Sequence, residues 1–435
     1  MSDAQSGPDS ASDGPYEVLR NRDFLLYLIG RFIASFGQQM LTIAVGWELY
    51  ERTGSALALG FVGLTYMIPM IGFTLPAGHL ADNFNRKKII IAMTGLASLA
   101  SLGLTLVSWW HGPTILIYLS LFVVGAARTF LWPASSAFLT QLVPRAEFPK
   151  AVNWNSGSFQ LSSVIGPAAG GGLIALTHGT VAIYAFNVAA TLVCLVLISM
   201  VRRHHVVAAR EPMSLKSLVA GVKFVFASRI IFGIITLDLF AVLLGGASTL
   251  LPVYAKDILH VGPEGLGLLQ AALPVGSLVC ALILAHRPPM ERAGRALLWA
   301  VAGFGLATVG FGFSTSFWLS MATLFLCGAT DNISVVVRHT LVQLLTPDEK
   351  RGRVSAVNSL FIGTSNELGG AESGLTAYWF GPLLHHVTDK ASPLYAHAVA
   401  TGAIISVVAG GIGTILVVLA VAYFWPEIRR YGKMT

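Results

Sequence analysis

Long apolar runs, separated by short polar segments, occupy most of this chain of 435 residues. A helix that crosses the hydrocarbon core of a membrane needs about 20 mostly apolar residues in succession. Such runs lie near 24–49, 56–80, 88–109, 113–141, 150–176, 180–201, 230–255, 265–286, 295–315, 317–345, 354–384 and 397–425. The pattern predicts an all-α membrane protein with twelve transmembrane helices, six on either side of a polar stretch.

The composition leaves little of the chain for a water-exposed surface. Hydrophobic residues make up 54% and charged residues only 11%, whereas soluble domains carry about 25% charged residues. The three cysteines, Cys194, Cys280 and Cys327, lie inside apolar runs without metal-ligand spacing, so we interpret them as packing residues. The sequence contains no Walker A, HExxH or GxSxG motif, and we therefore expect no enzyme activity, no metal and no cofactor.

The distribution of basic residues predicts the orientation, because Lys and Arg collect on the cytoplasmic side of a membrane. Placing both chain ends inside puts 22 of the 28 basic residues in cytoplasmic segments and only Arg52, Lys256 and Lys390 in outside loops. We therefore expect cytoplasmic termini in a bacterial inner membrane. Contact with anionic lipid, rather than with nucleic acid, then explains the net charge of +7.

The two sets of six runs resemble copies of one unit. Residues 60–69 align with 265–274 at an offset of 205, and Gly125 aligns with Gly328 at an offset of 203. Internal duplication of this kind is typical of membrane transporters, and it predicts two pseudo-symmetric six-helix halves. The expected divisions are a disordered cytoplasmic tail at 1–22, halves at 23–201 and 229–426, a cytoplasmic linker at 202–228 and a tail at 427–435.

The loop after the second run, GHLADNFNRKK, resembles the loop motif of the major facilitator superfamily. The positions that carry the motif are Gly78, Asp82, Arg86 and Lys87. In this family the aspartate and the arginine form a charge relay that latches the cytoplasmic gate, and the resemblance implies that role for Asp82 and Arg86. Asn83 and Asn85 depart from the family pattern, which implies a looser latch.

The fifth run contains IGPAAGGG, which resembles the antiporter motif of exporters in the same superfamily. Its defining positions are Gly166, Pro167, Gly170 and Gly171. A Gly-Pro pair in mid-membrane bends a helix, and glycines let neighbouring backbones approach. The motif implies export, and the alternative is a glycine-rich packing seam without a mechanistic role.

The stretches at 215–233, 250–277 and 341–361 resemble the branch of this superfamily that contains enterobactin and macrolide exporters. The resemblance implies a proton-coupled exporter of a small amphipathic molecule, a siderophore or a drug, that works by alternating access. An uptake permease or facilitator for a nutrient or an organic anion is the first alternative, and a membrane-embedded enzyme or receptor is the second. We expect a monomer whose partners are the substrate, protons and the lipid bilayer.

Ionisable side chains inside the predicted spans are the candidate transport residues, because each costs at least ~2.5–3.5 kcal/mol without a partner. The repeat relates Arg31 to Asp238 and Arg128 to Asp331. We hypothesise that these arginines and aspartates form charge pairs, or share a water-filled site, across the interface between the halves. Protonation of an aspartate would then couple proton entry to substrate exit. Local capping is the alternative, and Arg338, near the end of a span, is expected to snorkel.

Two further carboxylates, Glu367 and Glu372, belong to the predicted eleventh span. Five residues place them about 140° apart around a helix, so both cannot face one ligand. A break of the helix at Gly369 and Gly370 would change that, and broken helices mark binding sites in transporters. Either glutamate is an alternative proton carrier, ranked after Asp331.

Overall fold

The computed structural model describes residues 14, 16–202, 222–288, 290–383, 386 and 393–432, and every element in these residues is helical. The first half contains η1 (Glu17–Arg20), α1 (Arg22–Thr53), α2 (Ala56–Asn83), α3 (Arg86–Trp109), α4 (Thr114–Leu142), α5 (Phe148–Thr177) and α6 (Val181–Ser199). The second half contains α8 (Arg229–Leu244), η2 (Ala247–Leu250), α9 (Leu251–Val253), η3 (Tyr254–Ile258), α10 (Gly262–Ala285), α11 (Ala293–Gly312), α12 (Phe317–Leu345), α13 (Asp348–Tyr378), η4 (Trp379–Leu383), α14 (Pro393–Phe424) and α15 (Pro426–Arg430).

Polar caps and a glycine set where several helices begin and end. The Asn21 side chain accepts hydrogen bonds from the backbone N–H groups of Asp23 and Phe24, at 3.1 and 3.3 Å, and starts α1. Gly54 ends α1 with a φ of 59°, a conformation that favours glycine. Asn85, one of the two departures from the family loop motif, caps α3 by accepting a backbone N–H at 3.2 Å.

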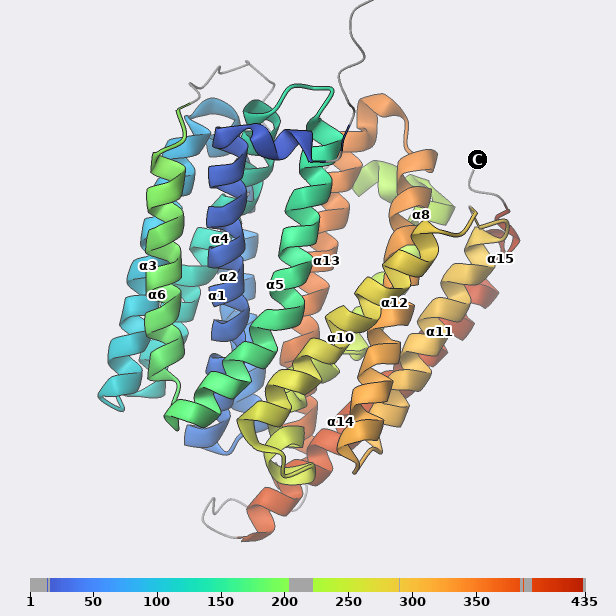
Figure 1. Ribbon diagram of the computed structural model, residues 1–435. Helices are drawn as coiled ribbons and strands as arrows, with labels where there is room; N and C mark the ends of the chain where they lie inside the picture. Colours follow the sequence, from blue (N-terminus) through green and yellow to red (C-terminus); the bar gives the residue numbers. More distant parts are fainter. Residues whose placement is uncertain are drawn as a thin grey trace, which may run out of the picture.

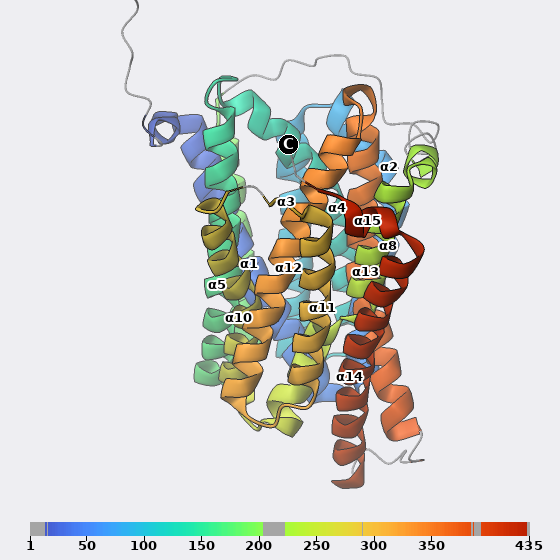
Figure 2. The same ribbon diagram turned by 90° about the vertical axis from the view of Figure 1, so that its right-hand side faces the viewer.

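The same pattern of helix packing occurs in both halves. In the first half, α1 packs against α5 and α6, α2 against α4, and α3 against α4 and α6. In the second half, α8 packs against α13 and α14, α10 against α12, and α11 against α12 and α14. The halves meet where α2 crosses α13 and α5 crosses α10, two contacts that the repeat relates to each other. Figures 1 and 2 show the resulting bundle, and the predicted all-helical, two-half fold is confirmed.

The chain is a multi-pass membrane protein. Eleven helices of its described part are long and apolar enough to cross a membrane. The remaining long helix, α13, has 31 residues but carries Glu367 and Glu372, and it is not one of the eleven. It packs against α2, α8 and α14, and contact with three other helices is the setting expected for a helix that carries polar residues in a membrane.

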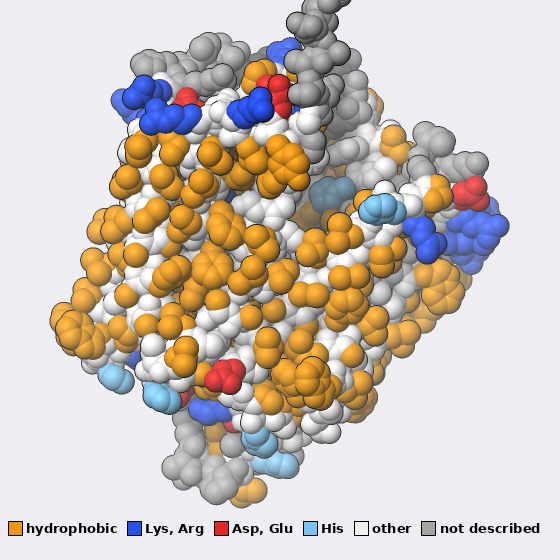
Figure 3. All heavy atoms as spheres, viewed as in Figure 1, with side chains coloured by type: hydrophobic (Ala, Val, Ile, Leu, Met, Phe, Trp, Pro, Cys, Tyr) orange, Lys and Arg blue, Asp and Glu red, His pale blue; other side chains and the backbone are white. Residues whose placement is uncertain are grey.

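Both ends of the described chain lie on one side of the bundle, where η1 and α15 are found (Figure 1). We refer to this as the termini side and to the opposite one as the far side. In Figure 3, Lys and Arg side chains gather toward the termini side, and a broad apolar band covers the surface between the two sides. A band of this kind suits contact with lipid tails.

The seventh span is interrupted, which the sequence pattern did not predict. We expected one helix over 230–255, but α8 ends before Gly245–Gly246, and the short elements η2, α9 and η3 complete the path to the far side. The break considered at Gly369–Gly370 is wrong, because α13 runs through it. A Cβ on Gly246 would lie 2.5 Å from the carbonyl oxygen of Gly369, so these glycines allow the interrupted span to touch α13.

The tails and the linker are described only in part. The chain becomes regular earlier than we expected from a disordered tail at 1–22, because Val18 is buried against the first half and Glu17–Arg20 form η1. Residues 1–13 and 15, most of the linker at 203–221, and 433–435 lie outside the described residues. At the other end, α15 is held by an ion pair between Arg229 and Glu427 at 3.1 Å.

Candidate functional site, a polar cavity between the halves

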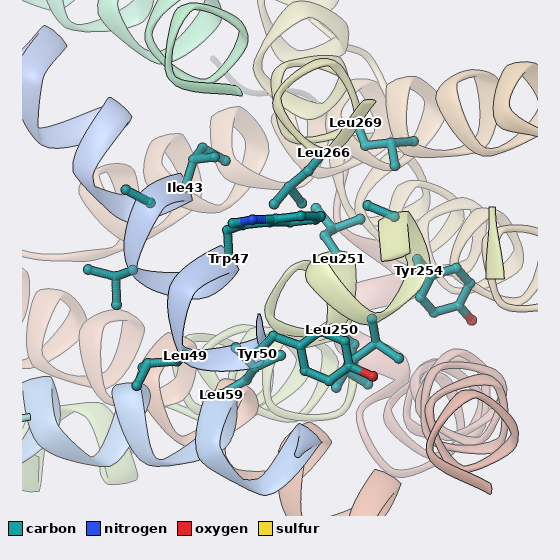
Figure 4. Close-up of a cluster of buried hydrophobic side chains, with 14 of the residues drawn as sticks. Ile43, Trp47, Leu49, Tyr50, Leu59, Leu250, Leu251, Tyr254, Leu266 and Leu269 are labelled. Atoms are coloured by element: carbon teal, nitrogen blue, oxygen red, sulfur yellow. The ribbon is translucent and has the colours of Figure 1, made fainter. Parts of the chain in front are cut away.

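A cluster of buried apolar side chains closes the far side of the molecule (Figure 4). Trp47 and Tyr50 come from the far-side end of α1, and Leu250 and Leu251 come from the interrupted seventh span. Figure 4 shows the Trp47 ring lying between Leu251 and Leu266. Because these residues belong to different halves, the cluster is a plug that seals the space between them.

Glycines bring the backbones of the two halves together on the same side. A Cβ on Gly171 of α5 would lie 3.0 Å from the Cα of Gly267 in α10, and one on Gly374 of α13 would lie 2.6 Å from the Cα of Gly60 in α2. Larger side chains do not fit at these crossings. On the termini side, in contrast, Figure 3 shows the surface hollowed between the halves. The space between the halves is therefore closed at the far side.

Behind the plug lies a cavity of about 320 Å³ whose walls come from both halves. Cavities of this size are at the small end of the range for ligand sites, which is about 300–1,000 Å³. Its polar lining consists of Gln39, Thr42, Tyr66, Arg128, Ser248, Thr249, Gln270, Asn366 and Glu367. Such a lining offers many hydrogen-bonding groups and one side chain of each charge, which suits an amphipathic organic molecule.

Arg128 and Glu367 supply the opposite charges of the cavity. Arg128, on α4 of the first half, is exposed to the cavity, and its guanidinium lies 5.5 Å from the centre of the Tyr66 ring. The ring packs against the backbone of α4, since a Cβ on Gly125 would lie 3.0 Å from it. Glu367, on α13 of the second half, lines the same cavity and interacts electrostatically with Arg128. An opposite-charge interaction between the halves therefore exists, with Glu367 in place of the predicted Asp331.

The other predicted pathway residues do not line this cavity. Arg31 lies beside Tyr27 and Cys194, inside the first half. Asp331 lies near Cys327 on α12 and makes no ion pair with any described residue. Glu372 accepts a hydrogen bond from the Thr376 hydroxyl at 2.7 Å, one turn along the same helix.

Asp238 forms its ion pair with Arg338, not with Arg31. The side chain of Arg338 is only 3% exposed, so the expectation that it snorkels is wrong. The pair ties α8 to α12 within the second half. At the equivalent place in the first half, the Tyr27 hydroxyl donates to the Ser135 carbonyl at 3.3 Å and ties α1 to α4. The repeat places Arg31 and Asp238 at equivalent positions of their own halves. Each side chain interacts with residues of its own half, Arg31 with Tyr27 and Asp238 with Arg338.

The loop motif joins α2, α3 and α6 on the termini side. Arg86 is buried and its Nε donates to the Ala81 carbonyl at 3.0 Å, while the Lys87 ammonium donates to the carbonyls of Ser199 and Val201, both at 2.7 Å. Asp82 forms no ion pair with Arg86 or with another residue of the described chain. Gly78 is buried in α2. The charge relay that the resemblance implies is thus unformed in this arrangement.

The glycines of the helix 5 motif are packing positions, some within one half and one between the halves. A Cβ on Gly166 would lie 2.6 Å from the Cβ of Gln39, and one on Gly170 would lie 3.1 Å from the Cα of Met40, both on α1. Gly171 and the carbonyl of Pro167 face α10 of the other half instead. The packing seam that we considered therefore continues into the contact that closes the far side.

The neutral polar residues of the cavity were not predicted, because the prediction of transport residues rested on ionisable side chains. Gln39, Thr42 and Gln270 lie in apolar helices and Asn366 lies in α13, and uncharged polar side chains in transmembrane helices need partners in the bundle interior. Their presence in predicted spans was the available signal. The sequence contained no comparable signal for Tyr66, since packing explains an aromatic residue in a span as readily as a binding role does.

Comparison with known proteins agrees with this architecture. The sequence profile of the Major Facilitator Superfamily matches residues 27–365. The chain is similar to the enterobactin exporter EntS of Citrobacter koseri, with 30% identity over 354 residues that cover 81% of this chain and 84% of that protein. It is also similar to EntS of Shigella flexneri, with 29% identity over 361 residues, 81% of this chain and 84% of that one.

Solved structures of transporters share the fold at low sequence identity. A bacterial homolog of the human lysosomal transporter Spinster, in an inward-facing and unoccupied conformation, has a TM-score of 0.71 and 14% identity, covering 97% of this chain and 98% of that one. The nucleoside transporter NupG has a TM-score of 0.71 and 11% identity, covering 94% and 99%. At these identities the likeness concerns the fold alone.

Proposed function

The chain belongs to the major facilitator superfamily and is a membrane transporter, not an enzyme, and on that premise we propose that it exports a small amphipathic organic molecule in exchange for protons. The observation that carries this proposal is the cavity between the halves, which holds Arg128 from one half and Glu367 from the other. A cavity that both halves build changes its access when the halves move relative to each other. Alternating access of this kind would carry the substrate across.

The distribution of charge supports an assignment of the side of the protein that faces the cytoplasm. Lys and Arg residues collect on the cytoplasmic side of membrane proteins, and in this chain they gather toward the termini side (Figure 3). We therefore assign the termini side to the cytoplasm of a bacterial cell, with the protein in the inner membrane. The cavity, closed at the far side, is then in the state that takes up substrate from the cytoplasm. The unpaired Asp82 fits this state, because a cytoplasmic latch is broken when that side is open.

Glu367 is our choice for the proton carrier, in place of Asp331, because it lines the cavity. A substrate whose hydroxyl or amine groups donate hydrogen bonds to the ionised carboxylate excludes a proton from it, and a proton excludes such a substrate. This mutual exclusion is what exchange requires. Arg128 interacts with the same carboxylate from the opposite half, so movement of the halves changes how readily Glu367 takes a proton.

The substrate class rests on the lining and on the relatives. The cavity wall presents hydroxyl and amide groups from seven neutral polar side chains beside its two charges, and such a wall favours a molecule rich in hydrogen-bonding groups over a purely lipophilic one. Two similar proteins are enterobactin exporters. We propose a siderophore as the substrate and a monomer as the working unit.

The test is substrate-driven proton movement in inverted membrane vesicles, with enterobactin as the first probe. We expect its addition to release protons from acid-loaded vesicles that contain the protein. Glu367→Gln should abolish that release, because the amide cannot carry the proton. Glu372→Gln is the matched control on the same helix, and it should keep the release, since Glu372 bonds locally to Thr376. Full proton release by Glu367→Gln would rule out this carboxylate as the carrier.

A second function, facilitated movement of an organic anion, is favoured by the exposed guanidinium of Arg128. An anion bound to Arg128 is compatible with a protonated Glu367, so proton and anion would move in the same direction or the proton would not move at all. The vesicle experiment separates the two functions by the sign of the proton signal. Substrate flux that leaves the vesicle pH unchanged would favour the facilitator.

A further inference from the structure

The far-side plug contains a polar contact between the halves. The Tyr50 hydroxyl, at the end of α1, donates a hydrogen bond to the carboxylate of Asp257 in η3. The Lys256 ammonium lies over the same ring, 5.8 Å from its centre. Tyr50 is only 2% exposed. The surrounding apolar contacts have no preferred direction, whereas this hydrogen bond fixes how α1 and η3 lie against each other.

The segment that carries Asp257 contacts the end of α11 in its own half. The Tyr254 hydroxyl donates to the Gly312 carbonyl at 3.0 Å, and the Tyr254 ring stacks on Phe311 with centres 4.4 Å apart. The segment nevertheless joins α8 through Gly245–Gly246, where no regular helix continues. A short segment with a glycine pair at one end can change its angle to the rest of a span.

We propose that the hydrogen bond between Tyr50 and Asp257 is the latch of the far-side gate, and that the segment from Gly245 to Ile258 is the part of the gate that moves away from α1. Breaking the bond returns the Asp257 carboxylate and the Tyr50 hydroxyl to water at the membrane surface, so opening has a modest cost. A hydrogen bond to a charged group is strong enough to change the fraction of open molecules about tenfold. Unlike the proposed exchange mechanism, this latch acts with or without substrate and protons.

The experiment measures access to the cavity from each side of the membrane. Thr42 lines the cavity wall on α1 and is exposed there, so Thr42→Cys provides a reporter thiol. The native cysteines Cys194, Cys280 and Cys327 are buried. A membrane-impermeant maleimide is applied to the far side in intact cells and to the termini side in inverted vesicles, and the labelling rate is measured for each.

We expect Tyr50→Phe and Asp257→Ala each to raise the labelling rate from the far side about tenfold, with a much smaller fall from the termini side, because the far-side-open state is the minor one. The double variant should match the stronger single one, because both changes remove one bond. Tyr118→Phe is the control, since it removes a tyrosine hydrogen bond to the Ala58 carbonyl, 2.8 Å long, within one half. Its labelling should equal that of the parent.

Three results would overturn the proposal. Far-side labelling at the parent rate in both single variants would show that the bond does not hold the gate. Effects that multiply in the double variant would show two separate contacts instead of one latch. A rise in far-side labelling of Tyr118→Phe as large as that of Tyr50→Phe would show that loss of any tyrosine hydrogen bond loosens the helix bundle. Since no substrate is added and the readout is thiol labelling instead of proton movement, these outcomes do not depend on whether the protein exchanges protons.

Discussion

Two opposite-charge interactions inside the protein have very different surroundings. Arg128 and Glu367 border a cavity, belong to different halves and form no ion pair within 4 Å. Asp238 and Arg338 are buried in one half and in direct contact. A charge beside a cavity can exchange its partner for water or substrate, whereas a buried charge that loses its partner has no replacement. The first setting suits transport, and the second suits structure.

Replacing one member of the buried pair of Asp238 and Arg338 should destabilise the protein more than replacing both. Asp238→Asn leaves the Arg338 guanidinium buried without a counter-charge, and we expect the free energy of unfolding to fall by about 3–5 kcal/mol. The double variant Asp238→Leu with Arg338→Leu should lose much less. Thermal unfolding in detergent compares them, and Asp331→Asn, which breaks no ion pair among the described residues, is the control. Equal melting temperatures for Asp238→Asn and the parent would contradict this role.

At the level of helices, the sequence pattern was most informative where apolar runs meet lipid and least informative inside the bundle. The spans before the linker were predicted within a few residues, because lipid imposes hydrophobicity on every exposed face. The interruption at Gly245–Gly246 was not predicted, since a glycine pair in an apolar run has the same composition whether the helix breaks or continues. At Gly369–Gly370 the helix does continue, although both pairs lie at the same close contact between the seventh span and α13.

The crossing of α5 and α10 provides a test at this level. Gly171→Ala would place a methyl group 3.0 Å from the Cα of Gly267, and overpacking of this kind costs about 1–3 kcal/mol. We expect the crossing to loosen, so that far-side labelling of Thr42→Cys rises and labelling from the termini side falls.

The next residue supplies the control for that test. A Cβ on Gly172 would meet nothing within 4 Å, so Gly172→Ala should label and transport like the parent. If Gly171→Ala also behaves like the parent, the crossing is not under the steric constraint that we infer.

For the molecule as a whole, the repeat predicted the architecture but not the partners of the charged residues. Equivalent helices make equivalent contacts in the two halves, which is why an internal alignment sufficed to find the fold. The same alignment suggested that Arg31 meets Asp238. Side chains at equivalent positions face one another only near the axis that relates the halves, and the sequence contains no information on their distance from that axis. The position of the cavity therefore follows from the structure and not from the repeat.

The orientation of the whole protein is open to a direct test. Because Lys and Arg favour the cytoplasmic side, a fluorescent protein fused to either chain end should fluoresce, and alkaline phosphatase fused there should be inactive. Phosphatase fused after Gly54, in the turn between α1 and α2, should be active. Active phosphatase at a chain end would place the termini side outside the cell. The cavity would then take up substrate from outside the cell instead of from the cytoplasm.

The unusual composition of α13 has a consequence for the biogenesis of this protein. A nascent segment enters the bilayer from the translocon when its own hydrophobicity favours lipid, and α13 falls short of the apolar character of the other long helices. It contributes two glutamates and packs against α2, which is synthesised near the beginning of the chain, and against α14, which is synthesised after it. Its stable insertion therefore depends on helices at both ends of the sequence, so the bundle is completed only once translation is almost finished.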